Sequence, residues 1–415
     1  MTASTTTNDP LSVEEIRSDF PSLTVPMHGK PLVYLDSAAT TLKPRPVLET
    51  IQEFYGHRYG TVRRAVYGLS EQATAAFERT RKTVTRFINA PTSRSIVFTK
   101  GTTESINLVA SSWGKTHLRP GDEVLISAME HHANIVPWQL ACEATGAQLR
   151  ILPMNSSGEL LTEELDTLLN KRTRLVAVTG LSNALGTINP IQEICSRAHA
   201  QGSLVLIDAA QMAGHMAIDV QALDCDFLAF SGHKVFGPCG VGVLYGKPEI
   251  LETMPPYQSG GDMIREVTFE KTTFADIPVR FEAGTPAIVE VIGLGSALEY
   301  IHSIGFEQIG AHEKDLLRYG TDLLEQIPKL RLIGTAAHKS SILAFILEDV
   351  HAHDIGTILD QAGIAIRAGH HCAQPTMKFF GVAATSRASL SIYNSREDLD
   401  ALALAIDEVI TLFRS

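Results

Sequence analysis

The stretch FLAFSGHKVFGP, residues 227–238, places Lys234 shortly after an apolar run. Only Ser231, Gly232 and His233 separate this lysine from the run. Burying an ammonium group is costly, and lysine is almost never fully buried without a partner. Either Lys234 reaches solvent, or another group in the fold takes up its charge. The surrounding sequence decides between these alternatives.

Short apolar, β-branched runs alternate with helix-like segments from about residue 94 to 246. One of these segments, PIQEICSRAHAQG (190–202), has proline at its first turn and glycine at its end, as expected of a helix. Strands that are apolar throughout and linked by helices predict an α/β fold with a mostly parallel sheet, whose ligands gather at the carboxyl ends of the strands. The runs are SIVFT (95–99), EVLISA (123–128), QLRILPM (148–154), TRLVAVTG (173–180), SLVLID (203–208), CDFLAF (225–230) and VGVLYG (241–246).

The pattern changes from about residue 285 onward, where long helix-like stretches precede short strands. This change predicts a smaller α+β domain that follows the sheet-forming region. We therefore expect an N-terminal arm over 1–30, a large domain over 31–290 and a small C-terminal domain over 291–415.

Composition excludes several classes of function. The chain has 415 residues and a net charge of −11, and it has no run of lysine or arginine, which argues against a nucleic-acid partner. No apolar run approaches the roughly 18–20 residues of a membrane span, and the opening MTASTTTNDP does not resemble a secretory signal. The five cysteines form no Cys-x-x-Cys pair, which argues against disulfides and a zinc ribbon. We expect a cytoplasmic protein without a metal.

Two polar groups follow neighbouring strands of the predicted sheet. Asp208 closes the run VLID, with Gln211 three residues later, and Lys234 follows the next run. Asp208 alone could be a helix cap or a surface residue. Together with a lysine able to form a Schiff base, however, it predicts pyridoxal phosphate, whose protonated ring nitrogen pairs with a carboxylate.

A phosphate group needs its own binding site. The segment TKGTTESINLV places Gly101, Thr102 and Thr103 ahead of a helix-like run, where free amides, hydroxyls and the helix dipole attract an anion. The alternative is a simple threonine cap. Ser231 and His233 would add donors from the lysine turn.

Polar residues also follow two other strands. His131 and His132 lie in SAMEHHANIVPW, but adjacent histidines rarely converge on one metal ion. We favour His131 as an imidazole lying flat against the cofactor ring. Asn183 lies past another strand, where it would bind the ring oxygen or a substrate carboxylate, or would be an ordinary turn residue.

The C-terminal region contains a candidate nucleophile and a candidate anchor. Cys372 lies in IAIRAGHHCAQP, where the histidines and Arg367 would favour its thiolate, although a His-His-Cys metal site is an alternative. Arg387, in SRASLSIYN, comes just before an expected strand. A guanidinium at the edge of a pocket can bind a carboxylate through two parallel hydrogen bonds.

These motifs resemble those of the group II cysteine desulfurases, the type that supplies sulfur to the SUF iron–sulfur assembly system. Such enzymes have the fold-type I structure of pyridoxal-phosphate-dependent transferases, with a large mixed-sheet domain and a small C-terminal domain, and are related to class V aminotransferases. The resemblance extends from VYLDSAATT to the last helix. The motifs are SNALGT, DAAQ, SGHKVFGP, RFEAGTP, RAGHHCAQP and RASLSIYN.

The resemblance implies how the cofactor is bound. Lys234 would hold pyridoxal phosphate covalently, and Asp208 would pair with its ring nitrogen. Gln211 would contact the phenolic oxygen, while His131 would stack on the ring and assist proton transfer. Thr285 would reach the phosphate of the neighbouring subunit, so a homodimer is implied. Within one subunit, the phosphate would be held by Thr103, Ser231 and His233.

The resemblance also implies the reaction. Asn183 and Arg387, together with Arg367, would bind the substrate carboxylate. Cys372 would attack the sulfur of L-cysteine, leaving L-alanine and a persulfide on the enzyme. The short RAGHHC loop is typical of group II, in which an acceptor of the SufE or SufU type takes the sulfur for iron–sulfur cluster assembly.

One segment departs from the family pattern. Relatives typically read Asn-Val-His-Arg-Gly before a further histidine, whereas this chain reads GTVRRAVYGLS. Arg64 keeps the arginine, but Arg63 and Tyr67 replace the two histidines. The change concerns the substrate range and the acceptor rather than the cofactor.

Two other interpretations remain. A selenocysteine lyase or another pyridoxal-dependent β-lyase would share every cofactor residue, and would differ in how far it depends on Cys372. A catalytically silent binding partner would keep only the fold, which is disfavoured because Lys234, Asp208 and Cys372 are all present.

Overall fold

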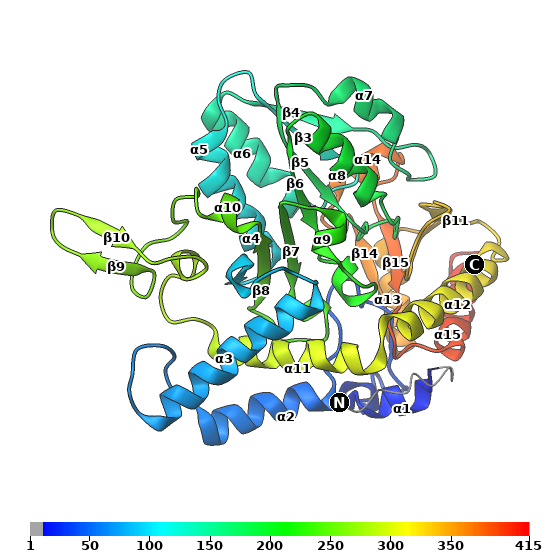
Figure 1. Cartoon of the computed structure of the whole chain (residues 1–415). Coiled ribbons are helices and arrows are strands. Elements are labelled where there is room, and N and C mark those ends of the chain that lie inside the picture. The colour runs from blue at the N-terminus through cyan, green and yellow to red at the C-terminus, as the bar shows by residue number, and fades with distance from the viewer. Residues whose placement is uncertain (1–10, 415) are drawn as a thin grey trace.

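The computed structural model describes residues 11–414, and at the centre of this part lies a seven-stranded sheet. The strand order is β2-β8-β7-β6-β5-β3-β4, in which β7, β6, β5, β3 and β4 run parallel and β8 runs antiparallel to both of its neighbours. This arrangement confirms the predicted α/β fold with a mostly parallel sheet (Figure 1). The strands are β2 (Ile96–Thr99), β3 (Glu123–Ser127), β4 (Gln148–Leu152), β5 (Thr173–Thr179), β6 (Leu204–Asp208), β7 (Phe227–Ser231) and β8 (Gly242–Gly246).

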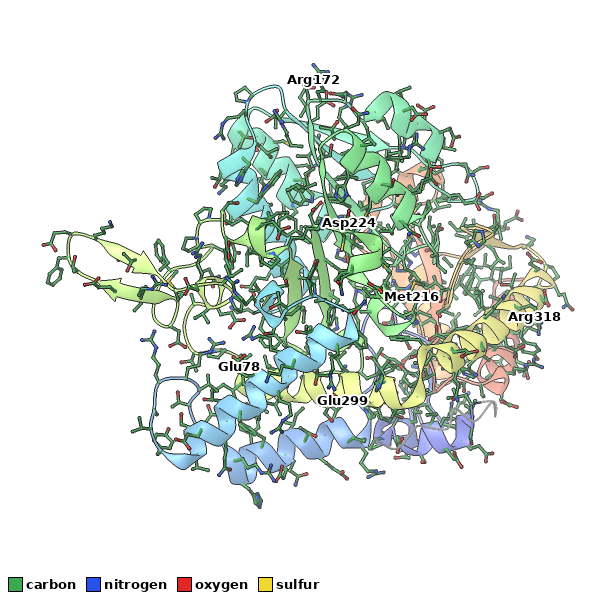
Figure 2. All side chains as sticks on the ribbon, viewed as in Figure 1. Glu78, Arg172, Met216, Asp224, Glu299 and Arg318 are labelled. Carbon is green, nitrogen blue, oxygen red and sulfur yellow. The ribbon has the colours of Figure 1, made fainter. Side chains whose placement is uncertain are left out.

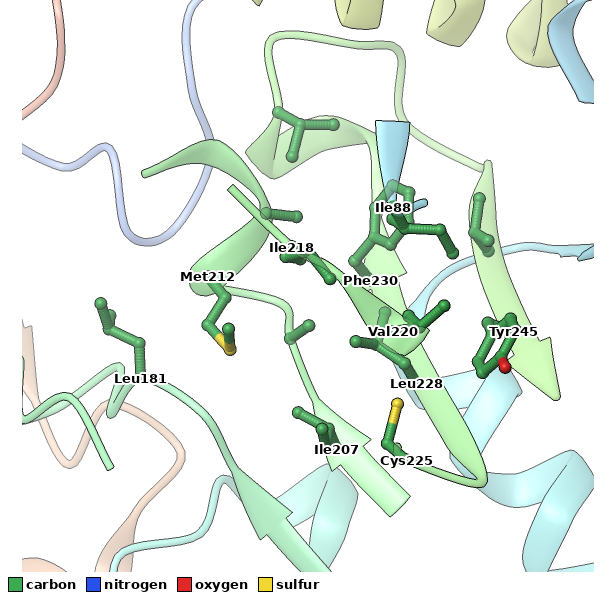
Figure 3. Close-up of a cluster of buried hydrophobic side chains, with 14 of the residues drawn as sticks. Ile88, Leu181, Ile207, Met212, Ile218, Val220, Cys225, Leu228, Phe230 and Tyr245 are labelled. Atoms are coloured by element: carbon green, nitrogen blue, oxygen red, sulfur yellow. The ribbon is translucent and has the colours of Figure 1, made fainter. Parts of the chain in front are cut away.

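The inner strands are apolar throughout because both faces of the sheet are covered. Ile207 and Leu228 face one apolar cluster. Their chain neighbours Leu206 and Phe227 face a second cluster on the opposite side. Figure 3 shows part of the first cluster, in which Phe230 also lies. Burying a side chain of this size is worth about 1.5–3 kcal/mol, so packing on both faces fixes the sheet.

Helices connect the strands and form the covering layers (Figure 1). The predicted helix over 190–202 is α8. The helices of this part are α2 (Arg45–Glu53), α3 (Gly68–Phe87), α4 (Thr102–Val109), α5 (Lys115–His117), α6 (Val136–Thr145), α7 (Leu165–Leu168), α8 (Ile191–Ala200), α9 (Val220–Leu223), α10 (Pro248–Leu251) and α11 (Ile288–Ile304).

A second, antiparallel sheet lies in the C-terminal part, with strand order β11-β12-β15-β14. Its helices enclose an apolar cluster of their own. Its strands are β11 (Leu330–Ile333), β12 (Ile342–Leu347), β14 (Arg367–Gly369) and β15 (Thr385–Ser389), and the helices are α12 (Phe306–Glu325), α13 (Ala352–Gln361), α14 (Gln374–Phe379) and α15 (Arg396–Arg414).

One prediction about this sheet is wrong. Arg387 was expected just before a strand, but it lies in the middle of β15. Its position there is set by pairing, because it lies opposite Ala344 of β12 and Arg367 of β14. The apolar residues after β15 are buried without being part of the strand.

The N-terminal segment pairs with the C-terminal part in a separate two-stranded sheet. The helix α1 (Val13–Ser18) precedes β1 (Val33–Tyr34), which pairs in parallel with β13 (Ile364–Ala365). The first ten residues of the expected arm lie outside the described residues. The expected boundaries 1–30, 31–290 and 291–415 stay a prediction.

Two further features lie away from the sheets. The hairpin of β9 (Ile264–Val267) and β10 (Thr272–Phe274) projects from the molecule, with Phe269 fully exposed near its tip (Figure 1). Below the sheet in the view, α3 carries Glu78 and α11 carries Glu299 (Figure 2). Over residues 11–414, the search for a helix long and apolar enough to cross a membrane finds none.

Candidate active site

The carboxyl ends of the parallel strands meet at one edge of the large sheet, and a cavity of about 200 Å³ lies there against the C-terminal part. The structure brings nearly all of the predicted site residues into the wall of this cavity. They are Thr102, Thr103, His131, Asn183, Asp208, Gln211, Ser231, His233, Lys234, Arg367, Cys372 and Arg387.

Thr285 is the exception. It lies in a separate cavity of about 490 Å³, beside Lys100, Cys239 and Glu290. The resemblance implies that Thr285 reaches the phosphate of a neighbouring subunit, and this role stays a prediction.

Lys234 faces the first cavity, which resolves the question raised by its apolar setting. It ends the 3-10 turn Gly232–Lys234 that follows β7. Desolvation lowers the pKa of Lys234 to about 8, although the nearby Asp208 carboxylate opposes this shift. The amine is thus poised between its charged and neutral forms near neutral pH.

Asp208 is a buried carboxylate that lacks a strong partner. It ends β6, and one of its oxygens accepts a hydrogen bond from the Ala210 N–H at 2.9 Å. Burial raises the pKa of Asp208, while Ala210 and Lys234 lower it. Within residues 11–414 no lysine, arginine or histidine lies in salt-bridge contact with Asp208. A buried carboxylate in this setting fits a cationic ring nitrogen, because no basic side chain of residues 11–414 pairs with it directly.

The start of α4 lines one corner of the cavity, where the sequence predicts a phosphate site. The Thr102 N–H donates to Ser231 Oγ at 2.8 Å, and the two hydroxyls lie 2.7 Å apart. Gly101 has φ +155°, and a side chain there would press on Ser231 Oγ. The Ser231 hydroxyl therefore helps to fix the helix start, and its predicted contact with a phosphate stays a prediction.

The turn that carries Lys234 is held from one side. The His233 carbonyl accepts hydrogen bonds from the hydroxyls of Thr40 and Thr41 and from Lys43 Nζ. Burial and the positive charges of Lys234 and Lys43 lower the pKa of His233 to about 4, so its imidazole is neutral. The segment that precedes α2 thereby fixes the lysine turn.

His131 is oriented by its own backbone. Its Nδ1 accepts the Ala133 N–H at 3.0 Å, which assigns the ring proton to Nε2. Burial, followed by the charge of Lys234, lowers the pKa of His131 to about 4. A neutral ring that lines the cavity is consistent with the predicted stacking and proton transfer.

The neighbouring Glu130 is a residue that the sequence reasoning missed. It is completely buried and accepts hydrogen bonds from Ser127 Oγ, from Asn134 Nδ2 at 2.7 Å and from the Thr179 N–H at 2.8 Å. Burial raises the pKa of Glu130 to about 8. The sequence feature that could have identified Glu130 is an acidic residue shortly after an apolar run, the same feature that identified Asp208.

Arg387 and Asn183 form the anchor corner. Arg387 Nη1 donates to the Asn183 carbonyl at 2.7 Å, and Nη2 donates to Asp36 Oδ1 at 3.0 Å. Its Nε is buried and has no hydrogen-bond partner. The Asn183 side chain donates to the His371 carbonyl at 2.7 Å, so it also supports the cysteine loop. Asp36 is a second residue that the sequence reasoning missed. Its position after a short strand gave no indication that it contacts Arg387.

The loop of Cys372 is short and tightly held between β14 and α14. Cys372 itself is exposed and has φ +53°, and its carbonyl accepts the His132 N–H at 2.7 Å. His132 Nε2 accepts the Gln374 N–H at 3.1 Å. The thiol therefore faces the cavity mouth on a fixed backbone.

The histidines near this loop differ from the expectation. Burial, Arg387 and Arg367 lower the pKa of His371 to about 3, and its Nε2 lies 2.8 Å from Thr385 Oγ1. His371 is therefore neutral, and positive charge near Cys372 comes from Arg387 and Lys234 instead. In the part of the chain that the structure describes, no group of three or more potential metal ligands is found.

Arg63, one of the two departures from the family pattern, is built into a buried ion network. Its Nη2 lies 2.7 Å from Glu282 Oε2, and its guanidinium stacks on Phe77. Arg81 also donates two hydrogen bonds to Glu282. This network fixes RFEAGTP, the segment that contains Thr285. Tyr67, the other departure, is half-exposed.

Comparison with known proteins gives a consistent match. The family model described as aminotransferase class-V matches residues 33–402. The cysteine desulfurase of Dickeya dadantii is 52% identical over 398 residues, which cover 96% of each chain. The cysteine desulfurase of Synechococcus elongatus is 51% identical over 399 residues, which cover 96% of this chain but 64% of that longer relative.

Crystal structures agree with these sequence matches. The cysteine desulfurase CsdA of Escherichia coli is similar with a TM-score of 0.91 and 41% identity, covering 97% of this chain and 100% of that one. A mutant of C-DES with glycine covalently linked to its pyridoxal phosphate cofactor is similar with a TM-score of 0.79 and 25% identity, covering 94% of this chain and 99% of that one. The fold is thus the fold-type I fold expected from the sequence.

Proposed function

Since the chain belongs to the class V aminotransferase family, we propose that it removes sulfur from L-cysteine, giving L-alanine and a persulfide on Cys372. The chain is a pyridoxal-phosphate-dependent enzyme of that family. One observation carries the proposal: Lys234, Asp208, Arg387 and Cys372 line a single cavity. They combine a cofactor lysine, a charge partner, a carboxylate anchor and a nucleophile.

The cavity fits the cofactor. Asp208 is a buried carboxylate without a basic partner among residues 11–414, Lys234 is an amine with a pKa near 8, and the start of α4 attracts an anion. When bound, pyridoxal phosphate supplies an electron-withdrawing ring that stabilises negative charge on the substrate α-carbon. Gln211 and His131 would contact the ring, while Thr102, Thr103, Ser231 and His233 would hold the phosphate.

The anchor corner orients the substrate. The partnerless Nε–H of Arg387 can donate to a substrate carboxylate, and a buried guanidinium binds such a group strongly. The Asn183 carbonyl fixes Arg387 in this direction. The Lys234 amine then accepts a proton from the substrate at Nζ, which its lowered pKa favours.

Cys372 takes the sulfur. Its thiolate forms an S–S bond with the substrate sulfur while the C–S bond breaks, and the electron pair of that bond stays with carbon, which gains a proton to become the methyl group of L-alanine. Lys234 and Arg387 line the same cavity as Cys372.

The experiment measures both the cofactor and the reaction. The purified protein should show the visible absorbance of bound pyridoxal phosphate and should form L-alanine from L-cysteine. Cys372→Ala should keep the absorbance and lose alanine formation. The matched control is Cys239→Ala, which removes another exposed cysteine and should retain activity. Lys234→Ala should lose the absorbance of the covalently bound cofactor.

Two results would contradict the assignment. Undiminished alanine formation from L-cysteine by Cys372→Ala would reject Cys372 as the nucleophile. Turnover of L-selenocysteine alone, independent of Cys372, would favour the selenocysteine lyase alternative.

We further propose that the enzyme is of the group II, SUF-supplying type and passes sulfur to a SufE- or SufU-type acceptor. The support is the short loop of Cys372, which His132 holds through hydrogen bonds to the Cys372 carbonyl and from the Gln374 N–H. A persulfide on such a loop cannot travel far, so an acceptor must approach the cavity mouth. Alanine formation should rise when an acceptor of this type is added; no response would reject this part.

We also propose a homodimer in the cytoplasm. Exposed apolar side chains such as Val66 and Phe269, and the position of Thr285 outside the first cavity, favour a partner copy. Sedimentation at micromolar concentration should give twice the chain mass. A monomer that retains full cofactor would reject the role of Thr285 across the interface.

A further inference from the structure

Asp36 lies immediately behind the anchor corner. Residues 35–38 run beside β15, where the Ser389 N–H donates to the Leu35 carbonyl at 2.7 Å and the Ala38 N–H donates to Ser389 Oγ at 2.9 Å. This pairing places Asp36 Oδ1 3.0 Å from Arg387 Nη2. Its Oδ2 lies 3.8 Å from Arg367 Nη1. One carboxylate thus contacts two guanidinium groups.

The two arginines would otherwise repel each other. Arg367 and Arg387 lie directly opposite on the antiparallel strands β14 and β15. Like charges in this arrangement destabilise a sheet, and Arg387 is also almost completely buried. Asp36 offsets this cost, because its charge is shared between them.

Asp36 differs from the arginines in its access to the cavity. Both arginines line the cavity and Asp36 does not. Its side chain is 20% exposed, whereas that of Arg367 is 46% exposed. A substrate therefore meets the two guanidinium groups, with the carboxylate behind them. Two positive charges and one negative charge leave a net charge of +1 at this corner.

The orientation of Arg387 also depends on Asp36. Of its three nitrogens, Nη1 is held by the Asn183 carbonyl and Nη2 by Asp36, while Nε remains without a partner. Two fixed nitrogens determine the plane of the guanidinium group, and hence the direction of the free Nε–H. Without Asp36, only one contact would hold the group.

We propose that Asp36 is a positioning and specificity-determining residue. It fixes Arg387 and leaves the anchor corner with a single net positive charge. Amino acids with one carboxylate therefore bind in preference to those with two. The inference rests on the proposed function, since it concerns the same substrate site. A second carboxylate would need Arg367, whose charge Asp36 partly offsets.

The test is an equilibrium titration of the holoenzyme that needs no turnover. L-alanine and L-aspartate are added separately, and binding is followed by the change in cofactor absorbance. Asp36→Asn keeps an oxygen for Arg387 Nη2 and removes the charge. The ratio of the L-aspartate to the L-alanine dissociation constant should fall about tenfold, the order expected of one charge contact in a partly screened site. An unchanged ratio would overturn the specificity role.

Two further variants separate positioning from charge. Asp36→Ala should bind L-alanine about tenfold more weakly than Asp36→Asn, because only the asparagine keeps an oxygen that holds Arg387 Nη2. Equal binding by the two variants would overturn the positioning role. The control Asp398→Asn removes a carboxylate that pairs with Arg17 away from the cavity, and it should leave the ratio unchanged.

If the Asp36 variants do not fold, Arg367→Gln tests the proposal instead. Arg367 is half-exposed, so its substitution should leave the fold intact. With Asp36 present, Arg367 is already partly offset, so this variant should change the ratio by less than about threefold. A loss of L-aspartate affinity above tenfold, with L-alanine unaffected, would overturn the proposal. Failure of the proposed function would show separately, as absent alanine formation from L-cysteine by the unaltered enzyme.

Discussion

Glu282→Gln is the substitution for which the structure supports the most quantitative prediction. The Glu282 carboxylate is buried and accepts four hydrogen bonds. Arg81 donates two of them at 2.7 and 3.0 Å, Arg63 donates one at 2.7 Å, and the Phe98 N–H donates one at 2.9 Å. A glutamine would bring an NH₂ group against guanidinium donors and would remove the negative charge.

The expected loss in free energy of unfolding follows from the arginine charges that Glu282→Gln leaves without their main partner. Arg81 is 3% exposed and would keep only Glu78 as an anionic partner, which is itself 40% exposed. Breaking a buried ion pair costs about 3–5 kcal/mol, and the remaining Glu78 contact places this case near 3 kcal/mol. For a chain of 415 residues the melting temperature should fall by roughly 3–4 °C.

Thermal unfolding of the holoenzyme at pH 7 measures this change. The control is Glu299→Gln, whose partner Arg86 is on the surface, and it should cost less than about 1 kcal/mol (Figure 2). Arg81 and Arg63 lower the pKa of Glu282, so its contribution is complete above the ordinary glutamate pKa of about 4.3 and is lost as pH falls further. The two proteins should therefore converge only below about pH 4. Equal melting temperatures at pH 7 would refute the reasoning.

Three further predictions concern the cavity. In cofactor-free protein, the rate of covalent pyridoxal phosphate uptake should rise with pH and level off above about pH 8, because the Lys234 amine is then neutral. A rate that does not change with pH would contradict the lowered pKa of Lys234. Gly242→Ala places a methyl group against the Gly101 backbone, so it should weaken cofactor binding measured by dialysis and absorbance, whereas Gly310→Ala, in open space, should not. Glu130→Gln turns an amide donor toward the NH₂ group of Asn134, whose oxygen already accepts a hydrogen bond from Trp138. The free energy of unfolding, measured with denaturant, should therefore fall by about 1–3 kcal/mol. An unchanged free energy of unfolding would show that the network rearranges freely.

Local sequence patterns were enough to predict which side chains gather at the edge of the large sheet. Asp208 and Lys234 each follow an apolar run, and parallel strands bring their carboxyl ends to one edge. Their convergence therefore follows from strand pattern alone. The same reasoning located His131 and Thr103, because they follow other strands of the same sheet.

The anchor half depended on tertiary packing. Asp36 and Arg387 are 351 positions apart, and their contact arises where the N-terminal segment lies beside β15. The place of Arg387 within β15 was set by its pairing with β12 and β14 rather than by the apolar residues after it. A sequence shows that a carboxylate or a guanidinium group needs a partner, because burial without one is costly. Which partner it finds is decided by the packing of distant segments, as the contact between Asp36 and Arg387 shows.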